Sequence, residues 1–459
     1  MWSSNTSIAP WSLLNVPLDV VFLILRLLPL DDVFALFKTC KHFFWVSQCR
    51  PFWVYANIDV DFYLRVPGRG TIDYGAVAID VLQARVSHSL RVYNAWRTNG
   101  AKLQHERSMS VDDSVRRVRM IPGTRILILV EECAVRLQAW GSDISQQIPL
   151  DLDEHFEVFD VKIFWVDSLQ CNIIIVGTTN RKHGPSLCNA LKLFRLDIQG
   201  PFGVHLLTTS FPHWISAFSL MDDQLVVVGH RLPRKYFLQT FKVVYGHPGS
   251  LVPVFNVTLG SNTIGASSLT ILDGTHFLFA NDVGLSVYRL SMRKEMHSGV
   301  PRRITPCWSY KYARFDYLSR PPVGPVVFDC TTGDKSVAIC GGKFLRRLVM
   351  TAHRPSRFLL SEVDLVAHVP VYLGITAGLR LGLCHIPFHS PTFRTFQLFG
   401  GRVDDHPFSS RHSTDGGSLA YRLVSGIVEP RSVDMDEGEG RLVFLLRTTN
   451  SMYMVMLEL

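Results

Sequence analysis

The sequence predicts a mainly β protein with an α-helical module at its N-terminus, a helical connector and a β-propeller-like repeat domain. Three observations support this fold class. Apolar residues recur at helical spacing between residues 14 and 46, and again between residues 76 and 97. From about residue 115, short strand patterns and tight turns alternate to the end of the chain. We expect a flexible start at residues 1–12, the helical module at 13–55, the connector at 56–112 and the propeller at 113–459.

The composition indicates a folded protein of the cytoplasm or nucleus. Of its 459 residues, 47% are hydrophobic and 19% charged, which is enough for a large core. The nine cysteines are widely spaced and none forms a CxxC pair, as is typical of reduced, buried thiols. The net charge is +8, but the basic residues are scattered rather than gathered in a stripe, so no nucleic-acid partner is expected.

The apolar segment at residues 14–46 raises the question of membrane insertion. A spanning helix needs roughly 20 consecutive apolar residues, whereas Asp19, Arg26 and Pro29 interrupt this segment. A signal peptide needs a positively charged start, and the first 18 residues contain no Lys or Arg. We therefore expect short helices and no membrane insertion.

Local chemistry predicts three helices in this segment. Pro17 suits the first turn of a helix, and the residues after it are apolar on both sides, so this helix must be buried all round. Pro29 ends it. Asp31 or Asp32 can cap a second helix, and Thr39 can cap a third. Three helices this short cannot bury so much apolar surface among themselves, so either the rest of the chain or another protein covers them.

The order of these residues resembles the F-box. The matching positions are Pro17-Leu18-Asp19-Val20-Val21, Ile24-Leu25, Leu28, Asp32-Val33, Leu36, Thr39-Cys40-Lys41, Phe43, Val46 and Phe52-Trp53. The pattern departs at Val16 where Leu is usual, at Asp19 where Glu is usual, and at Phe43 where Trp is common. F-box domains bind the Skp adaptor of cullin–RING ubiquitin ligases, so the resemblance implies that this adaptor covers the module.

The resemblance implies a set of residues that contact the Skp adaptor. They are Pro17, Leu18, Val21, Ile24, Leu25, Leu28, Val33, Leu36, Cys40, Phe43 and Trp53. Some of them must form the module's own core, and the two groups are not separated by the pattern. Charged residues at Leu25 and Leu28 are expected to abolish adaptor binding and leave the β domain folded.

The connector is expected to contain one amphipathic helix from about Ala76 to Arg97. Its apolar positions are Ile79, Leu82, Val86, Leu90, Tyr93 and Trp96. Because they form a single stripe, the helix is predicted to pack on the domain that follows.

The remaining chain repeats one unit of alternating strand, Gly/Asp turn, continuous apolar strand, loop and alternating strand. Residues 115–140, 218–243, 268–290 and 433–459 share this plan, with weaker copies around the turns at 167–170, 331–334 and 376–379. About seven turns at intervals of roughly 45–60 residues are typical of propeller blades. We expect an irregular, seven-bladed propeller; a six- or eight-bladed ring and a pair of β-sandwiches are alternatives. An F-box, a helix and an irregular propeller together are similar to F-box proteins abundant in mushroom-forming fungi.

No catalytic, cofactor or metal site is expected. Cys384, His385 and His389 lie close together, but no second ligand cluster accompanies them. The carboxylate-rich segment 434–440 suits Ca²⁺, yet its place between two apolar strands predicts a hairpin tip. Gly341-Gly342-Lys343 lacks the spacing of a phosphate-binding loop.

These expectations describe a non-enzymatic substrate-recognition subunit of an SCF-type (Skp–cullin–F-box) ubiquitin ligase. The helical module would bind the Skp adaptor and through it the cullin–RING ligase, and the propeller would bind an unidentified target protein through unknown residues. The mechanism would be proximity between target and conjugating enzyme. The alternative is a non-catalytic propeller scaffold whose N-terminal helices pack on the same chain, without a ligase role. An enzyme built on a propeller is a third hypothesis.

Overall fold

The structure is a computed structural model of the chain. It describes residues 16–64, 73–97, 105–140, 145–146, 156–166, 170–179, 188–197, 204–231, 235–246, 248–259, 268–280, 284–289, 302–311, 323–328, 335–340, 345–351, 357–363, 375–377, 381–386, 392–397, 418–420, 429–436, 439–447 and 451–458. The expected start at residues 1–12, the Gly341-Gly342-Lys343 segment and His389 lie outside these ranges.

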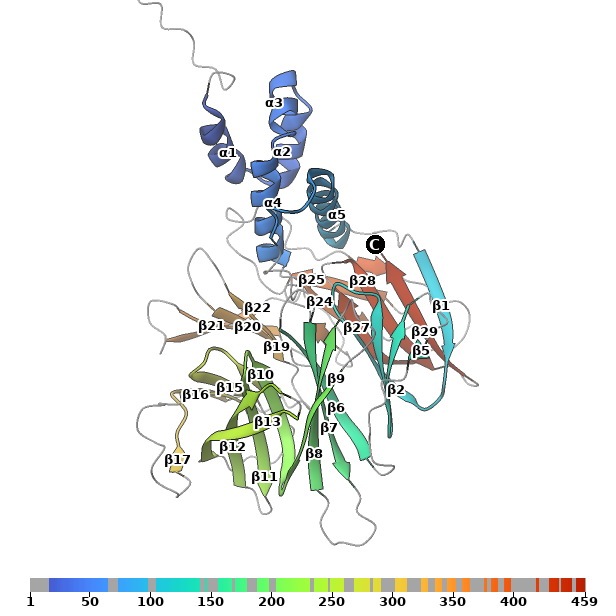
Figure 1. The fold of residues 1–459 in the computed structure, drawn as a ribbon, viewed down its shortest axis with the longest axis vertical. Helices are drawn as coiled ribbons and strands as arrows, with labels where there is room; N and C mark the ends of the chain where they lie inside the picture. The colour runs from blue at the N-terminus through green and yellow to red at the C-terminus, as the bar shows by residue number, and fades with distance from the viewer. Residues whose placement is uncertain are drawn as a thin grey trace, which may run out of the picture.

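Five helices precede the sheets. They are α1 (Leu18–Arg26), α2 (Leu30–Phe37), α3 (Lys41–Val46), α4 (Arg50–Leu64) and α5 (Ile79–Arg97). From here on the helical module means α1–α5, so it includes the helix of the expected connector. It stands at one end of the molecule, with α4 and α5 on the side toward the sheets (Figure 1). None of the helices in the described ranges combines the length and the apolar character that crossing a membrane requires.

The helix boundaries follow the prolines more closely than the predicted caps. Pro29 and Cys40 precede α2 and α3 without making a side-chain cap bond. Asp31 and Asp32 lie in the first turn of α2, where the helix dipole favours a negative charge. The Thr39 hydroxyl donates at 2.7 Å to a carbonyl in the last turn of α2, so it closes that helix instead of opening the next. Both predicted caps, Asp31 or Asp32 for α2 and Thr39 for α3, are therefore wrong, although the helices form as expected.

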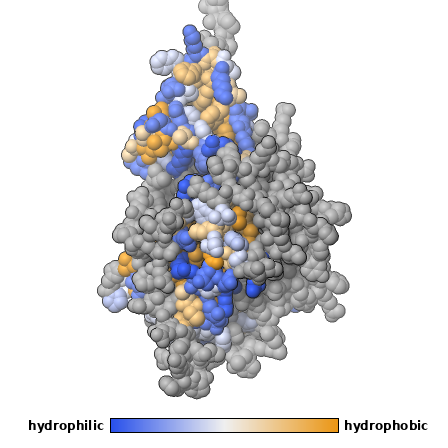
Figure 2. Space-filling model, turned by 90° about the vertical axis from the view of Figure 1, so that its right-hand side faces the viewer, coloured by the Kyte–Doolittle hydropathy of each residue, from blue (hydrophilic) through white to orange (hydrophobic). Residues whose placement is uncertain are grey.

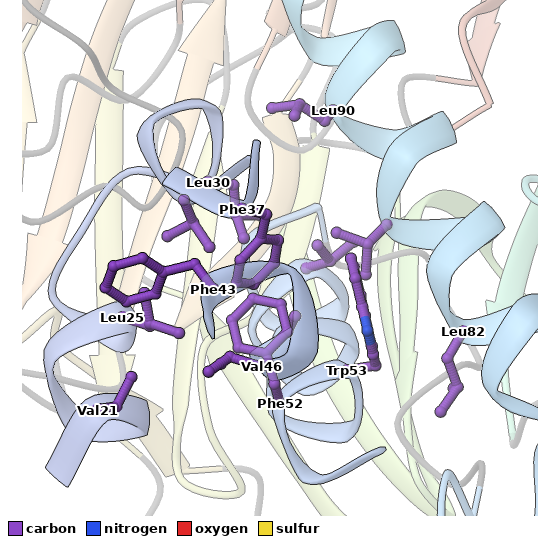
Figure 3. Packing of buried hydrophobic residues seen from close by; sticks show 14 of the residues in the cluster. Val21, Leu25, Leu30, Phe37, Phe43, Val46, Phe52, Trp53, Leu82 and Leu90 are labelled. Carbon is purple, nitrogen blue, oxygen red and sulfur yellow. The ribbon is translucent and has the colours of Figure 1, made fainter. Parts of the chain in front are cut away.

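An apolar core of its own holds the helical module together (Figure 3). Its buried members are Val21, Leu25, Leu30, Val33, Phe37, Phe43, Val46, Phe52, Trp53, Ala56, Val60, Tyr74, Leu82, Val86 and Leu90. The rings of Phe37 and Phe52 meet edge to face with centroids 5.0 Å apart. The buried Asn57 amide donates to the carbonyls of Trp53 (2.8 Å) and Leu82 (3.0 Å), which fastens α4 to α5.

The described strands form seven sheets. The first contains β2 (Val115–Met120), β3 (Ile126–Glu131), β4 (Val135–Ala139) and β5 (Ser145–Gln146), and the second contains β6 (Phe156–Trp165), β7 (Gln170–Thr179), β8 (Cys188–Asp197) and β9 (Val204–Phe211). The third contains β10 (Trp214–Met221), β11 (Gln224–Arg231), β12 (Lys235–Val244), β13 (Ser250–Leu259) and β17 (Arg302–Ile304), and the fourth contains β14 (Ser268–Ile271), β15 (His276–Ala280), β16 (Gly284–Arg289) and β18 (Trp308–Lys311).

The fifth sheet contains β19 (Val323–Phe328), β20 (Lys335–Cys340), β21 (Leu345–Met350) and β22 (Phe358–Val363), and the sixth contains β23 (Ile375–Ala377), β24 (Leu381–Ile386), β25 (Thr392–Gln397) and β26 (Ser418–Ala420). The seventh contains β1 (His105–Val111), β27 (Glu429–Asp436), β28 (Arg441–Arg447) and β29 (Met452–Glu458). Neighbouring strands are antiparallel, except that β17 adds to β13 in parallel.

The sheets follow one another around a ring and form a seven-bladed β-propeller, as the repeat predicts (Figure 1). The innermost strands β2 and β27 lie side by side, so the first and last blades meet. The strand β1 pairs with β29 from His105 opposite Glu458 to Val111 opposite Met452, which brings both ends of the domain into one sheet. The ring thus takes its first strand from residues assigned to the connector, and it starts at His105 rather than at residue 113.

Apolar side chains fill the spaces between successive blades. One buried cluster joins the fourth and fifth blades through Leu278, Val287, Val337 and Leu348. Another joins the first and seventh through residues such as Val118 and Leu445. Together with the clusters between the first and second, second and third, and third and fourth blades, these contacts bury the first four blades on both faces, which explains their uninterrupted apolar strands.

Polar side chains on β27 bond the seventh blade to the first blade. We call this contact between the two blades the ring seam. The Asp434 carboxylate accepts the backbone N–H of Met120 at 2.6 Å, and the Asp436 carboxylate accepts that of Gly123, also at 2.6 Å. Gly123 has a φ of 75°, which an L side chain rarely adopts. The segment predicted as a hairpin tip does turn at Glu439 and Gly440, but two of its carboxylates serve the seam.

Burial raises the pKa of Asp436 to about 6, and the nearby Glu439 charge adds to this rise, against the hydrogen bond from Gly123 and the charge of Arg441. Since the folded-state pKa lies above the unfolded value, the stability linked to this carboxyl is present at low pH and is lost as pH rises through about 6. Both oxygens of the Asp436 carboxylate accept backbone N–H groups, so Asp436→Asn loses one acceptor at every pH but no longer titrates. We expect the unfolding free energy of Asp436→Asn relative to the parent to rise by about 1 kcal/mol between pH 5 and pH 7.5 in urea titrations. An equal difference at both pH values contradicts this account, and Asp223→Asn, whose side chain is 49% exposed, is the control.

Candidate partner-binding surface

Helix α1 is apolar on two opposite sides, and its own chain covers one of them. Val21 and Leu25 point into the core of the module and are 1% and 2% exposed. Val20, Leu23 and Leu27 are 39%, 60% and 85% exposed. Their spacing of three and four residues places these three on one stripe, turned away from the buried side. We call Val20, Leu23 and Leu27 the outer stripe.

Further apolar side chains are exposed on α3 and α4. Phe44 and Trp45 on α3 are 58% and 73% exposed, and Tyr55 and Ile58 on α4 are 43% and 46% exposed. The Arg26 guanidinium at the end of α1 lies 4.9 Å from the Tyr55 ring centre, so α1 ends beside the open face of α4. Figure 2 shows hydrophobic residues gathered on the helical module. Large side chains exposed in such density on a small module are typical of an interaction surface.

The structure separates the predicted contact residues into three groups. Val21, Leu25, Val33, Phe43 and Trp53 are buried in the core of the module (Figure 3). Ile24, Leu28 and Leu36 are partly buried at its edge. Pro17, Leu18 and Cys40 are exposed. The first group forms the core that holds the helices together, the exposed residues are available to a partner, and adaptor contact by any of the three groups stays a prediction.

The four most exposed large apolar side chains of the module are absent from the predicted contact set. They are Leu23, Leu27, Phe44 and Trp45. A helical projection of α1 predicts the outer stripe, because it places Leu23 and Leu27 opposite Val21 and Leu25. Which side faces inward depends on packing against α3 and α4, and the periodicity of α1 alone does not fix it.

The core that supports this surface also has directional contacts. The Trp53 indole N–H donates to the Ser47 carbonyl at 2.6 Å, which fixes the turn between α3 and α4. Asn94 on α5 donates to the Asp31 carboxylate at 3.2 Å, so α2 is tied to α5. The helices against which the buried side of α1 packs are therefore held together by polar as well as apolar contacts.

Charged side chains on the inner strands of the ring are paired with one another or with backbone. Arg119 lies 3.7 Å from Asp434, and Arg117 lies 4.0 Å from Asp160. The Lys162 ammonium donates to the Phe218 carbonyl at 2.8 Å, and burial lowers its pKa. Within the described ranges, no three His, Cys, Asp or Glu side chains gather in a way that could hold a metal ion.

Neither a protein-family model nor a curated protein matches the chain. Among solved structures it is similar to Hsv2 from Kluyveromyces lactis, with 13% identity and a TM-score of 0.37 over 73% of this chain and 90% of that one. It is also similar to the AfRom2 CNH domain (8% identity, TM-score 0.38, 78% and 98% covered). The β-propeller domain of the Trilobed protease from Pyrococcus furiosus gives 8% identity and a TM-score of 0.38, with 78% and 94% covered. The propeller assignment rests on the order and pairing of the seven sheets.

The two sides of α1 should respond differently to truncation. Leu25→Ala removes a fully buried side chain and should lower the stability of the helical module by about 2–5 kcal/mol. Leu27→Ala removes an exposed one and should change it by less than about 0.5 kcal/mol. Hydrogen exchange of the α1–α4 amides measures both effects in the full chain. Equal loss of protection in the two variants would mean that the chain covers the outer stripe.

Proposed function

We propose that this chain is a substrate-recognition subunit of an SCF-type ubiquitin ligase. In this role the helical module binds the Skp adaptor through the outer stripe and the exposed residues beside it, and the ring binds a target protein. The protein would act in the cytoplasm or nucleus and would supply no catalytic group. Its contribution would be proximity, because a target held near a charged conjugating enzyme reacts without the entropic cost of a bimolecular encounter.

The observation that carries this proposal is the uncovered apolar side of α1. Leu23 and Leu27 keep most of their surface open, although Val21 and Leu25 on the opposite side are fully buried. Covering one leucine side chain is worth about 1.5–3 kcal/mol, so a partner that covers both gains a substantial part of its affinity there. The residue pattern of the F-box, whose helices α1–α3 form as expected, indicates the Skp adaptor as that partner.

The scaffold hypothesis requires the N-terminal helices to pack on the ring. In Figure 1, α1–α3 stand apart from the sheets, and α4 and α5 lie between them and the ring. The apolar core of the module contains residues of the helices and of the segment before α5, and no strand residue among those described. This arrangement favours an outside partner for α1.

A double charge substitution on the outer stripe tests the proposal. Leu23→Asp with Leu27→Asp should weaken binding to purified Skp adaptor by at least about 100-fold, because two carboxylates would have to be desolvated where two leucines were buried. Biolayer interferometry with the full chain measures this. The residues first considered for charging, Leu25 and Leu28, are less suitable, since a charge at the buried Leu25 would unfold the module.

Leu359→Asp is the matched control, because this leucine on β22 of the ring is 45% exposed and distant from the module in sequence. It should bind the adaptor like the parent. Unchanged binding by the double variant, or no binding by the parent, would overturn the proposal.

A further inference from the structure

The helical module contacts the ring at the turn between β27 and β28. On α5, His88 Nε2 lies 3.5 Å from the Glu439 carboxylate, while its Nδ1 lies 3.0 Å from the Arg91 guanidinium. A guanidinium only donates hydrogen bonds, so Nδ1 is the acceptor in that pair. Nε2 is then the ring nitrogen that faces Glu439, in a close polar contact that lacks the geometry of a hydrogen bond. This is a polar contact between the helical module and the ring.

Several groups of the ring hold Glu439 in place. Its backbone N–H donates to Asp436 at 3.3 Å, and the Arg441 guanidinium lies 3.6 Å from its carboxylate. Arg441 also donates to the Thr124 carbonyl in the first blade at 2.9 Å and lies 3.3 Å from Glu458 on the closing strand β29. The acceptor that meets His88 is thus fixed by the first and seventh blades together.

Helix α5 has a second buried face at this contact. Leu82, Val86 and Leu90 belong to the core of the module, whereas Val92 is fully buried outside that cluster. Val92 follows His88 by one turn and lies on the same face of α5. The face that carries His88 therefore lies against something other than the core of the module, and Figure 1 places α5 beside the blade that contains β28.

We propose that His88 and Glu439 are positioning residues that fix the orientation of the helical module on the ring. His88 and Glu439 are only 34% and 14% exposed, which limits competition from water for this polar contact. Because Glu439 is held by the ring seam, the orientation of α5 follows the closed ring. Under the proposed ligase role, this contact sets the distance between a bound target and the adaptor.

Two exposed native cysteines allow a direct distance measurement. Cys40 lies between α2 and α3, and Cys133 lies in the turn between β3 and β4. Spin labels on this pair, with the other accessible cysteines replaced by serine, report the module-to-ring distance distribution by pulsed electron paramagnetic resonance. We expect His88→Ala to broaden this distribution by about twofold, and His88→Gln, whose amide keeps a donor near the Nε2 position, to preserve it.

Glu439→Ala is expected to broaden the distribution like His88→Ala, and the double variant no further than either single one. Lys242→Ala, which removes an exposed ion pair of 3.5 Å with Asp223, is the control and should match the parent. Unchanged widths in both single variants, or a His88→Gln width equal to that of His88→Ala, would overturn the proposal.

Adaptor binding should be the same in parent and His88→Ala. If neither binds the adaptor, the ligase role fails while the distances still decide the positioning proposal.

Discussion

The arrangement of the helical module depends on one constraint, which is that α1 is apolar around its circumference and its own chain covers only one side. The covered side, with Val21 and Leu25, joins the aromatic core that α2, α3 and α4 build around Phe37, Phe52 and Trp53. The open side leaves Leu23 and Leu27 in contact with solvent. A small module pays a solubility cost for such a surface, so its presence favours a function in binding.

The ring meets a different constraint, which is closure. The ring is closed by the pairing of its first strand β1 with its last strand β29. Opening the ring there would break every backbone hydrogen bond between these two antiparallel strands. The adjacent seam adds Asp434 and Asp436, which accept backbone N–H groups of the first blade. These carboxylates lose hydration on burial, and the hydrogen bonds compensate part of that cost. The same region carries Glu439, so closure and the contact with α5 share one turn.

The sequence predicts those features that depend on local pattern. Pro17 marks the start of α1, Pro29 separates α1 from α2, and the recurring turns indicate the blades and their number. Features that depend on distant pairing are not predictable in this way. The strand β1 has a polar composition, HERSMSV, and its partner lies at the other end of the chain. Likewise, β17 follows the first three strands of the fourth blade in the sequence, yet it pairs in parallel with β13 at the edge of the third blade.

The candidate surface shows the same division between local pattern and packing. Residue types indicated the helical module, but the packing of α1 against α3 and α4 decides that Leu25 is core and Leu27 is surface. No local sequence pattern predicts the contact of His88, because its partner Glu439 is far away in the sequence and adjacent only in the folded protein.

The most direct test of the account is the reactivity of a thiol placed on the outer stripe. Leu27→Cys should react with a maleimide at the rate of a fully accessible cysteine in the free chain, since the leucine it replaces is 85% exposed. Saturating Skp adaptor should slow this reaction at least about tenfold, because a bound partner excludes the reagent. Slow labelling in the free chain would show that the polypeptide covers its own first helix, and a rate unaffected by the adaptor would show that this surface serves another purpose.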